Sequence, residues 1–331
     1  MLKLIRSNNT INYLLAFIAM LALWAYKFVE MPTAVDTGGV HSYFFMLSYE
    51  SSLFQYIFTS FVFAISFVFA CYLSKANFKY QMVESGYQSP TVFFTLLTGS
   101  VINAQRCIPE MFASIFISLA ILRIFSMYNK RDEIRGCLDV GLLYGISLLF
   151  AYKYVVLLPA LLLVMAIVKP LSWRDVVSFL ISMVFSIGIA FCLVWLYGNM
   201  NELLENVRIE AQRLVIGEKY DMLNLYFNFP VIFSVLISFL SMFIVRMSRK
   251  TSEVKYSHAM LFLLVYYGVF LASPLSSNES VWIMYFPLCY LLSNILVNAK
   301  KRYVQAIIFY GLIISLVVSQ MIQIFYYNSI F

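Results

Sequence analysis

Long apolar segments separated by short polar ones run through the whole sequence. A transmembrane helix needs about 20 mostly apolar residues, and eleven segments approach or reach that length. The eleven segments are residues 11–30, 53–74, 91–105, 110–127, 137–150, 153–168, 176–197, 228–246, 259–274, 281–298 and 303–326. The third and the fifth are short, so we expect them to be tilted or half-buried. The pattern predicts an all-α fold: a polytopic membrane helical bundle with about eleven transmembrane helices.

Two polar connections are longer than the others, residues 31–52 and 198–227. Within the second, apolar residues recur at helical spacing while charged residues fill other positions, a pattern typical of a helix lying on the membrane surface. The apolar positions are Leu204, Val207, Ala211 and Leu214. We therefore expect an interfacial helix over residues 200–216. The remaining connections are too short for a folded domain, which predicts a single membrane domain over residues 1–331.

The amino-acid composition excludes a soluble globular protein. The chain is 62% hydrophobic and 12% charged, whereas soluble domains carry about 45–50% apolar and about 25% charged residues. A net charge of +7 could indicate a nucleic-acid partner, but basic residues of membrane proteins gather in cytoplasmic loops for topological reasons. We therefore predict no nucleic-acid binding.

The five cysteines are scattered without a CxxC pair, and the two histidines are far apart. Such cysteines are typically free thiols that behave as small hydrophobic residues, and zinc sites need a denser group of ligands. We therefore predict no metal site of cysteine and histidine. The sequence also has no P-loop and no GxGxxG, so an ATP-driven machine would need its ATPase from a partner.

The basic residues predict the orientation in the membrane. With the N-terminus in the cytoplasm, 17 of the 23 lysines and arginines fall on the inner side, as the positive-inside rule requires. The C-terminus then lies outside, and so do the connections 31–52 and 198–227.

The first outer connection, residues 31–52, holds the first candidate residues. Asp36 and His41 flank Gly38 and Gly39, and glycines allow a tight turn or a close approach to a ligand. Spacing alone supports only a solvated turn residue at Asp36.

A second group lies in NAQRCIPEMFASIF, residues 103–116, where Arg106 and Glu110 stand four apart at the outer start of a span. Pro109 suits the first turn of a helix, and Glu110 suits its positive end. One interpretation is a capping arrangement with a local ion pair. The other is a carboxylate and a guanidinium directed into an outward cavity.

A third group is the hairpin GLLYGISLLFAYKYVVLLPALLLVM, residues 141–165, with Lys153 at its outer turn. Lys153 either extends its ammonium to the membrane interface or faces a phosphate. At the inner side, Arg123 and Asp139 are expected to form ion pairs or to reach the interface.

Taken in order, these three groups resemble the integral-membrane GT-C glycosyltransferases, which take a sugar from a polyprenyl-phosphate carrier. The similarity is clearest over residues 100–170, about a fifth of the chain, and the number of spans is also similar. The first outer loop is shorter than in that family and lacks its acidic pair. The chain also resembles an uncharacterised group of membrane proteins from Bacteroidota, which implies the bacterial inner membrane.

The resemblance implies a role for each candidate. Asp36 would be the general base or would orient the acceptor hydroxyl, and Glu110 would be the second outer acid, which steers the acceptor or a divalent cation. Arg106 and Lys153 would bind the phosphate of the carrier, since arginine matches phosphate oxygens bidentately. His41 is a further candidate for substrate binding. The implied partners are membrane lipid, a polyprenyl-phosphate-linked sugar and other membrane proteins.

Two other classes of function remain open at this point. The first is a non-enzymatic multi-pass protein: a lipid or glycan flippase, a transporter or an assembly subunit. The second is a membrane enzyme of another class, although the sequence contains no GxSxG, HExxH or His-x4-Asp motif. A fold does not establish an activity, so the arrangement of the candidate residues must decide between these classes.

Overall fold

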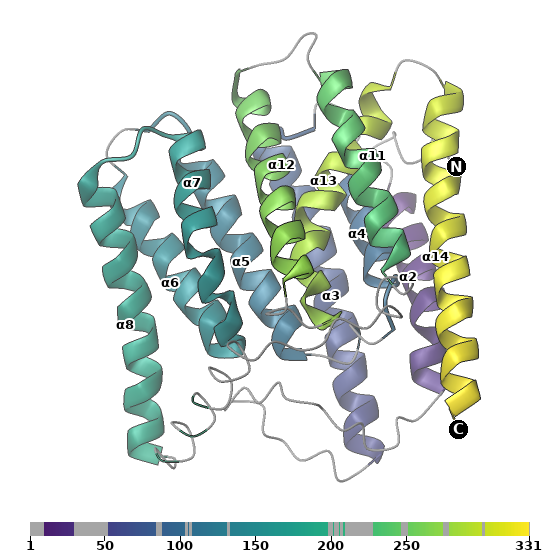
Figure 1. The fold of residues 1–331 in the computed structure, drawn as a ribbon, viewed down its shortest axis with the longest axis horizontal. Coiled ribbons are helices and arrows are strands. Elements are labelled where there is room, and N and C mark those ends of the chain that lie inside the picture. Colours follow the sequence, from purple (N-terminus) through teal and green to yellow (C-terminus); the bar gives the residue numbers. More distant parts are fainter. Residues whose placement is uncertain are drawn as a thin grey trace.

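A computed structural model describes most of the chain. The described residues are 10–29, 52–83, 88–102, 105, 108–130, 133–197, 201, 205, 208, 228–245, 251–273, 278–299 and 302–330. Within them the fold is all-helical, with eleven α-helices and no strands. Figure 1 shows these helices standing side by side as a bundle. The helices are α2 (Ile11–Val29), α3 (Ser52–Tyr80), α4 (Ser89–Thr98), α5 (Ile108–Ser126), α6 (Ile134–Phe150), α7 (Leu158–Val168), α8 (Trp173–Tyr197), α11 (Phe229–Val245), α12 (Thr251–Ala272), α13 (Trp282–Asn298) and α14 (Arg302–Ile330).

Each predicted apolar segment coincides with one of these helices, so the prediction of an all-α bundle is confirmed. Consecutive helices run in alternating directions (Figure 1). We call the end with the α5–α6 and α7–α8 connections the upper end, and the end with the α4–α5 and α6–α7 connections the lower end. The short 3₁₀ helix η3 (Tyr152–Leu157) links α6 to α7 at the lower end, and η4 (Asn278–Val281) precedes α13 there.

Within the described residues, five helices are long and apolar enough to cross a membrane, which supports membrane localisation. These stretches are Thr59–Tyr80, Pro109–Ser126, Trp173–Leu196, Thr251–Ala272 and Tyr303–Phe325. The last of them follows a regular pattern, because Ile307, Ile314 and Phe325 are exposed while Leu312 and Leu316 are buried. An apolar exposed face is what a lipid-facing helix requires, since lipid tails do not penalise it.

Two helices form the centre of the bundle, because their residues are buried on every side. All ten residues of α4 are buried, and so are residues 282–297 of α13. A helix that is apolar all round is stable only inside a protein or a membrane. The two helices contact each other through side chains such as Phe94 and Tyr285. Their rings pack edge to face, with the ring centroids 6.5 Å apart.

Helices α6 and α8 approach closely because glycines line their contact. A Cβ atom on Gly141 would lie 2.2 Å from the backbone oxygen of Phe179, and one on Gly145 would lie 1.9 Å from Ser186 Oγ. The two glycines form a Gly-x-x-x-Gly motif, which lets membrane helices pack backbone against backbone. Ser182 Oγ also donates a hydrogen bond to the carbonyl of Leu138 at 2.5 Å.

Helix α8 is attached to the bundle mainly through this contact, and its opposite face is exposed. Its two tryptophans, Trp173 and Trp195, are 79% and 70% exposed. They stand 22 residues apart, or about 33 Å at the rise of an α-helix, which is close to the thickness of the hydrocarbon core. Tryptophans favour both membrane interfaces, so α8 has the length and the anchors of a complete membrane crossing.

The predicted interfacial helix over residues 200–216 lies largely outside the described residues. The three described positions, Asn201, Glu205 and Arg208, are helical and exposed. They follow one another at spacings of four and three, so they share one polar face of a helix.

Candidate functional site

The structure describes two of the five candidate residues, Glu110 and Lys153. Asp36, His41 and Arg106 lie outside the described residues. Glu110 occupies the first turn of α5 and follows Pro109. A proline is well accommodated in this turn, and a carboxylate is stabilised by the positive end of the helix dipole. Lys153 lies in η3, the 3₁₀ helix that links α6 to α7.

The structure joins these two residues, which the sequence had placed in separate groups. Lys153 Nζ forms an ion pair with Glu110 Oε1, and the hydroxyl of Tyr154 donates a hydrogen bond to Glu110 Oε2. The side chain of Glu110 is fully buried and that of Lys153 is 7% exposed. Lys153 therefore does not extend into the interface as one interpretation held, and its ammonium is directed at Glu110. Tyr154 was missed, although it directly follows Lys153 in Ala-Tyr-Lys-Tyr.

Neighbouring tyrosines hold the turn that carries Lys153 and Tyr154. Tyr144 on α6 donates from its hydroxyl to the carbonyls of Tyr154 at 2.8 Å and Val155 at 3.2 Å. Tyr266 on α12 donates to the carbonyl of Val156 at 2.7 Å. These bonds satisfy carbonyl groups where the regular helix is interrupted, and they fix the turn against two helices.

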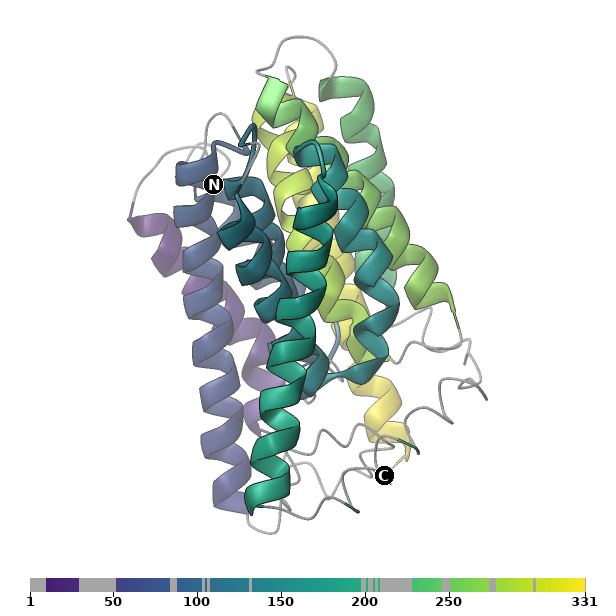
Figure 2. The ribbon, with the colours of Figure 1, turned by 90° about the vertical axis from the view of Figure 1, so that its left-hand side faces the viewer.

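A hydrogen bond to α3 gives the depth of Glu110. Ser66 Oγ contacts Sδ of Met111, the residue next to Glu110, at 3.1 Å. Ser66 lies fourteen residues after Ser52, the first residue of α3, so it stands well inside that helix. Helices α3 and α8 also extend below the lower ends of α5 and α7, as the two views agree (Figures 1 and 2). The ion pair therefore lies within the apolar depth of the bundle rather than at its rim.

A charge pair at such depth has a definite energetic consequence. Removing two charges from water costs several kcal/mol per ion, and their attraction offsets this only if both are well hydrogen-bonded. Breaking one partner of a buried pair typically costs about 3–5 kcal/mol. Charged residues at membrane depth are rare and mark functional sites by default, so the pair is the first candidate for a functional role.

The neighbours of Glu110 do not suit the divalent cation that the family resemblance allowed. Both carboxylate oxygens already meet donors, the ammonium of Lys153 and the hydroxyl of Tyr154. Within the described residues, no three His, Cys, Asp or Glu side chains gather in a way that could hold a metal ion. We therefore derive no step through a metal ion.

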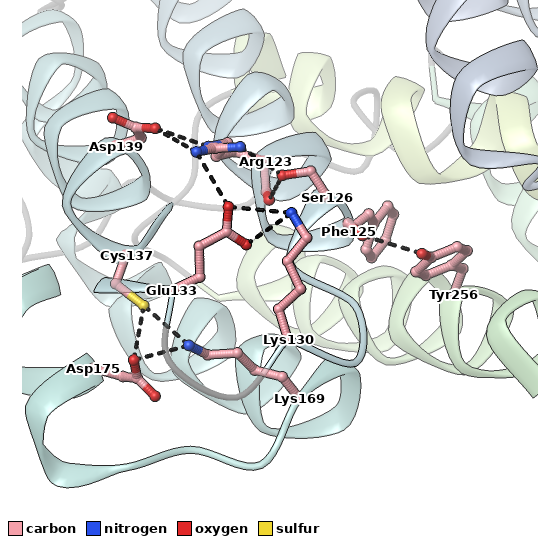
Figure 3. Close-up of polar contacts among 10 residues, drawn as sticks. All are labelled: Arg123, Phe125, Ser126, Lys130, Glu133, Cys137, Asp139, Lys169, Asp175 and Tyr256. Carbon is pink, nitrogen blue, oxygen red and sulfur yellow. Dashed lines mark hydrogen bonds and ion pairs between the residues drawn. The ribbon is translucent and has the colours of Figure 1, made fainter. Parts of the chain in front are cut away.

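The upper end of the bundle carries a second set of charged contacts (Figure 3). Arg123 Nε donates to Asp139 Oδ2 at 2.8 Å, which confirms that these two residues form an ion pair. Glu133 lies 3.2 Å from Lys130 Nζ and 3.8 Å from Arg123. These groups are partly exposed, and such ion pairs contribute about 0–1 kcal/mol each.

A buried cluster that the sequence analysis missed lies beside them. Lys169 Nζ is 2.9 Å from Asp175 Oδ1 and donates to Cys137 Sγ at 3.3 Å, and both charged side chains are almost fully buried. Ser172 precedes α8 and exchanges hydrogen bonds with Asp175, because its N–H donates to Oδ2 and its Oγ accepts from the N–H of Asp175. This Ser-x-x-Asp pattern before an apolar run resembles a capping box and was the available signal for Asp175.

The cysteines are free thiols wherever the structure describes them, as predicted. These are Cys71, Cys137, Cys192 and Cys289. Cys107 lies outside the described residues.

Comparisons with known proteins place the chain in a family but assign no activity. No curated protein and no solved structure matches it. One family does match over residues 37–327, which is most of the chain and covers the helices from α3 to α13 and α14 up to residue 327. The chain thus belongs to DUF6427, a family of unknown function.

Proposed function

We propose that the protein is a GT-C-like glycosyltransferase of the bacterial inner membrane, which moves a sugar from a polyprenyl-phosphate carrier to an acceptor at the outer face. In this proposal the N-terminus is cytoplasmic, and the lower end of the bundle faces outward. The observation that carries the proposal is the convergence of Glu110 and Lys153 at membrane depth. The two residues come from different predicted spans, and both were candidates in the sequence.

The depth of this pair suits a substrate that is itself a lipid. A polyprenyl chain stays in the hydrocarbon layer, so its phosphate-linked sugar must meet the protein near the lower interface. Met111, the residue next to Glu110, contacts Ser66, which lies well inside α3. The longer helices α3 and α8 flank this lower region (Figure 2). Both also expose apolar side chains near their lower ends, such as Ile57 and Leu196.

The proposed reaction is an inverting displacement at the anomeric carbon. The acceptor hydroxyl attacks that carbon, the bond from the carbon to the phosphate oxygen of the carrier breaks, and the carrier phosphate leaves with the bonding electrons. Asp36 takes the proton of the hydroxyl, a role that requires it to come within hydrogen-bond reach. Arg106 binds the phosphate, and His41 contributes to substrate binding in the same outer region.

Within this scheme Glu110 steers the acceptor, and Lys153 has a different role from the one expected. The structure directs its ammonium to the carboxylate of Glu110, so Lys153 compensates that charge and orients it together with Tyr154. The phosphate of the carrier is then left to Arg106.

A second candidate function is a non-enzymatic multi-pass component, such as a flippase, a transporter or an assembly subunit. It is favoured by the fact that Glu110 and Lys153 compensate each other inside the protein, as a purely structural ion pair would. Under this alternative, the charges hold α5 against the α6–α7 turn and do not meet a substrate.

Sugar transfer by the purified, reconstituted protein tests the proposal. A panel of polyprenyl-phosphate sugars serves as donors, and membrane insertion is checked in parallel. We expect Asp36→Asn to lower turnover by about 10²–10⁴-fold, the usual contribution of a general base, and Arg106→Ala to act mainly by raising KM.

Asp139→Asn is the matched control, because it removes a carboxylate of an exposed ion pair at the opposite end. It should leave turnover close to that of the unaltered protein. Absence of transfer from every donor by the unaltered protein would favour the non-enzymatic alternative. Full turnover in Asp36→Asn would remove Asp36 from the mechanism.

A further inference from the structure

The last helix, α14, carries a buried polar stripe inside an otherwise apolar span. Its stretch Tyr303–Phe325 is apolar enough to cross a membrane, yet Ser319 and Gln323 are only 1% exposed and Gln320 is part-buried. Polar side chains at membrane depth usually face the protein interior and find partners there. Their partners therefore indicate what the stripe is for.

The partners are backbone groups of one short segment that follows α4. Gln323 accepts a hydrogen bond at Oε1 from the N–H of Ile102 at 2.8 Å and donates from Nε2 to the carbonyl of Ser100 at 3.1 Å. Gln320 donates from Nε2 to the carbonyl of Gly99 at 2.7 Å and to that of Leu23 at 2.9 Å. Two glutamines thus hold residues 99–102 against α14 and α2.

This segment needs such partners because it is not helical. Helix α4 ends at Thr98 after ten residues, and the last carbonyls of a helix have no partner within it. Water is not available at membrane depth, so irregular backbone is tolerated there only if protein groups satisfy it. Gln105 contributes from within the segment, since its Nε2 donates to the carbonyl of Thr98 at 3.3 Å. Ser100 Oγ also lies 3.1 Å from the hydroxyl of Tyr285 on α13.

At Gly99 the backbone of the segment packs directly against α2. A Cβ atom there would lie 2.6 Å from the Cβ of Leu23 on α2, so the backbone at Gly99 already contacts α2 as closely as possible. The amide of Gln320 bridges the same two residues through their carbonyls. The segment is therefore fixed from α2, α13 and α14 at once.

The same segment leads directly to the candidate site. Glu110 follows Gln105 by five residues, a distance of at most about 18 Å even for a fully extended chain. The position of this segment therefore limits where the first turn of α5, which carries Glu110, can lie. We infer that Gln320 and Gln323 are positioning residues, which fix the α4–α5 connection and thereby set the place of Glu110. The effect on catalysis rests on the proposed function, whereas the effect on the connection does not.

Hydrogen–deuterium exchange in nanodiscs tests the positioning directly. Gln323→Met keeps the length of the side chain and removes its hydrogen bonds to Ile102 and Ser100, and Gln320→Met removes those to Gly99 and Leu23. We expect backbone amides of residues 99–105 to exchange about tenfold faster or more in Gln323→Met, as expected when a buried hydrogen bond is lost. Amides of α13 should remain as in the unaltered protein.

Gln305 on the same helix provides a matched control. It is 3% exposed and its Nε2 donates to the carbonyl of Ala299 at 2.6 Å, but it lies at the other end of α14. Gln305→Met should therefore leave exchange in residues 99–105 unchanged. Unaltered exchange of this segment in both Gln323→Met and Gln320→Met, or equal acceleration in Gln305→Met, would overturn the positioning role.

Turnover gives a second measurement, because it reports on the position of Glu110 and not only on the packing of the segment. We expect Gln323→Met to lower kcat by about tenfold and also to raise the KM for the donor, because Glu110 and the phosphate-binding Arg106 both follow this segment in the chain. An unchanged kcat together with faster exchange would show that the connection does not determine the position of Glu110. If the unaltered protein transfers no sugar, the proposed function fails, and the exchange experiment still decides whether the glutamines fix the connection.

Discussion

At the scale of single residues, two pairs of buried opposite charges stand out in the described part of the chain. Glu110 with Lys153 lies at the lower end, and Lys169 with Asp175 lies at the upper end. Each pair also has a third polar partner, the hydroxyl of Tyr154 in one case and the thiol of Cys137 in the other. These extra hydrogen bonds are what makes burial of a charge tolerable. The two pairs are therefore alike in burial but differ in their place in the bundle.

Lys169 gives a prediction for the dependence of stability on pH. Burial by itself would lower the pKa of Lys169, but hydrogen bonds and the charge interaction with Asp175 and Cys137 hold it above its ordinary value. A raised folded-state pKa means that the contribution to stability is complete below the unfolded-state pKa, about 10.4. It is lost as the pH rises through the higher folded-state value.

We therefore expect the difference in melting temperature between the unaltered protein and Lys169→Met to be constant from pH 7 to about pH 10. The difference should shrink at higher pH. Groups that titrate in both proteins largely cancel in this comparison. A difference that stayed constant up to pH 12 or grew with pH would contradict the assigned direction of the pKa shift.

At the scale of elements, the apolar segments predicted where helices exist better than where they end. Helix α3 continues to Tyr80 and α12 begins at Thr251, beyond the predicted limits of 74 and 259. Polar residues near the membrane surface can continue a helix. A prediction based on the length of apolar segments does not include these residues. Helix α4 instead ends at Thr98. The next residue, Gly99, packs against α2, and the glutamines of α14 form hydrogen bonds with the backbone there. That end depends on tertiary contacts, which the local sequence does not contain.

The contact between α6 and α8 gives a prediction at this scale. Gly145→Ala places a methyl group where Ser186 Oγ and the backbone oxygen of Met183 stand 1.9 and 2.7 Å away. Such overpacking typically costs about 1–3 kcal/mol, because the backbone oxygen cannot move aside cheaply. We expect a lower unfolding free energy, measured by reversible unfolding in mixed micelles.

Gly188 on α8 is the matched control, because a Cβ atom there would meet nothing within 4 Å. Gly188→Ala should leave stability unchanged or raise it by up to about 1 kcal/mol through helix propensity. Equal effects of the two substitutions would show that the Gly141–Gly145 motif does not set the approach of the two helices.

At the scale of the whole molecule, the bundle brings together residues that no local pattern connects. The sequence singled out Glu110 and Lys153 separately, because charges are rare in apolar segments. Their pairing, and the contact of Glu110 with Tyr154 across 44 positions of the chain, follows from the packing of α5 against the α6–α7 turn. The stripe of Ser319, Gln320 and Gln323 was visible in the sequence as polar residues at spacings of one and three. Its partner segment was not.

In the proposed function, Glu110 acts in sugar transfer and is not only one half of a structural ion pair. Comparing turnover and unfolding free energy in Glu110→Gln, Lys153→Met and the double variant tests it most directly. Each single change breaks the buried pair and should lower the unfolding free energy, by about 3–5 kcal/mol for Lys153→Met, which leaves a buried carboxylate without its counter-charge. The double variant leaves no uncompensated charge and should recover most of that loss. We expect transfer to stay reduced by about 10²-fold in Glu110→Gln and in the double variant, the cost of losing the orientation of the acceptor. Recovery of both stability and full transfer in the double variant would contradict the account.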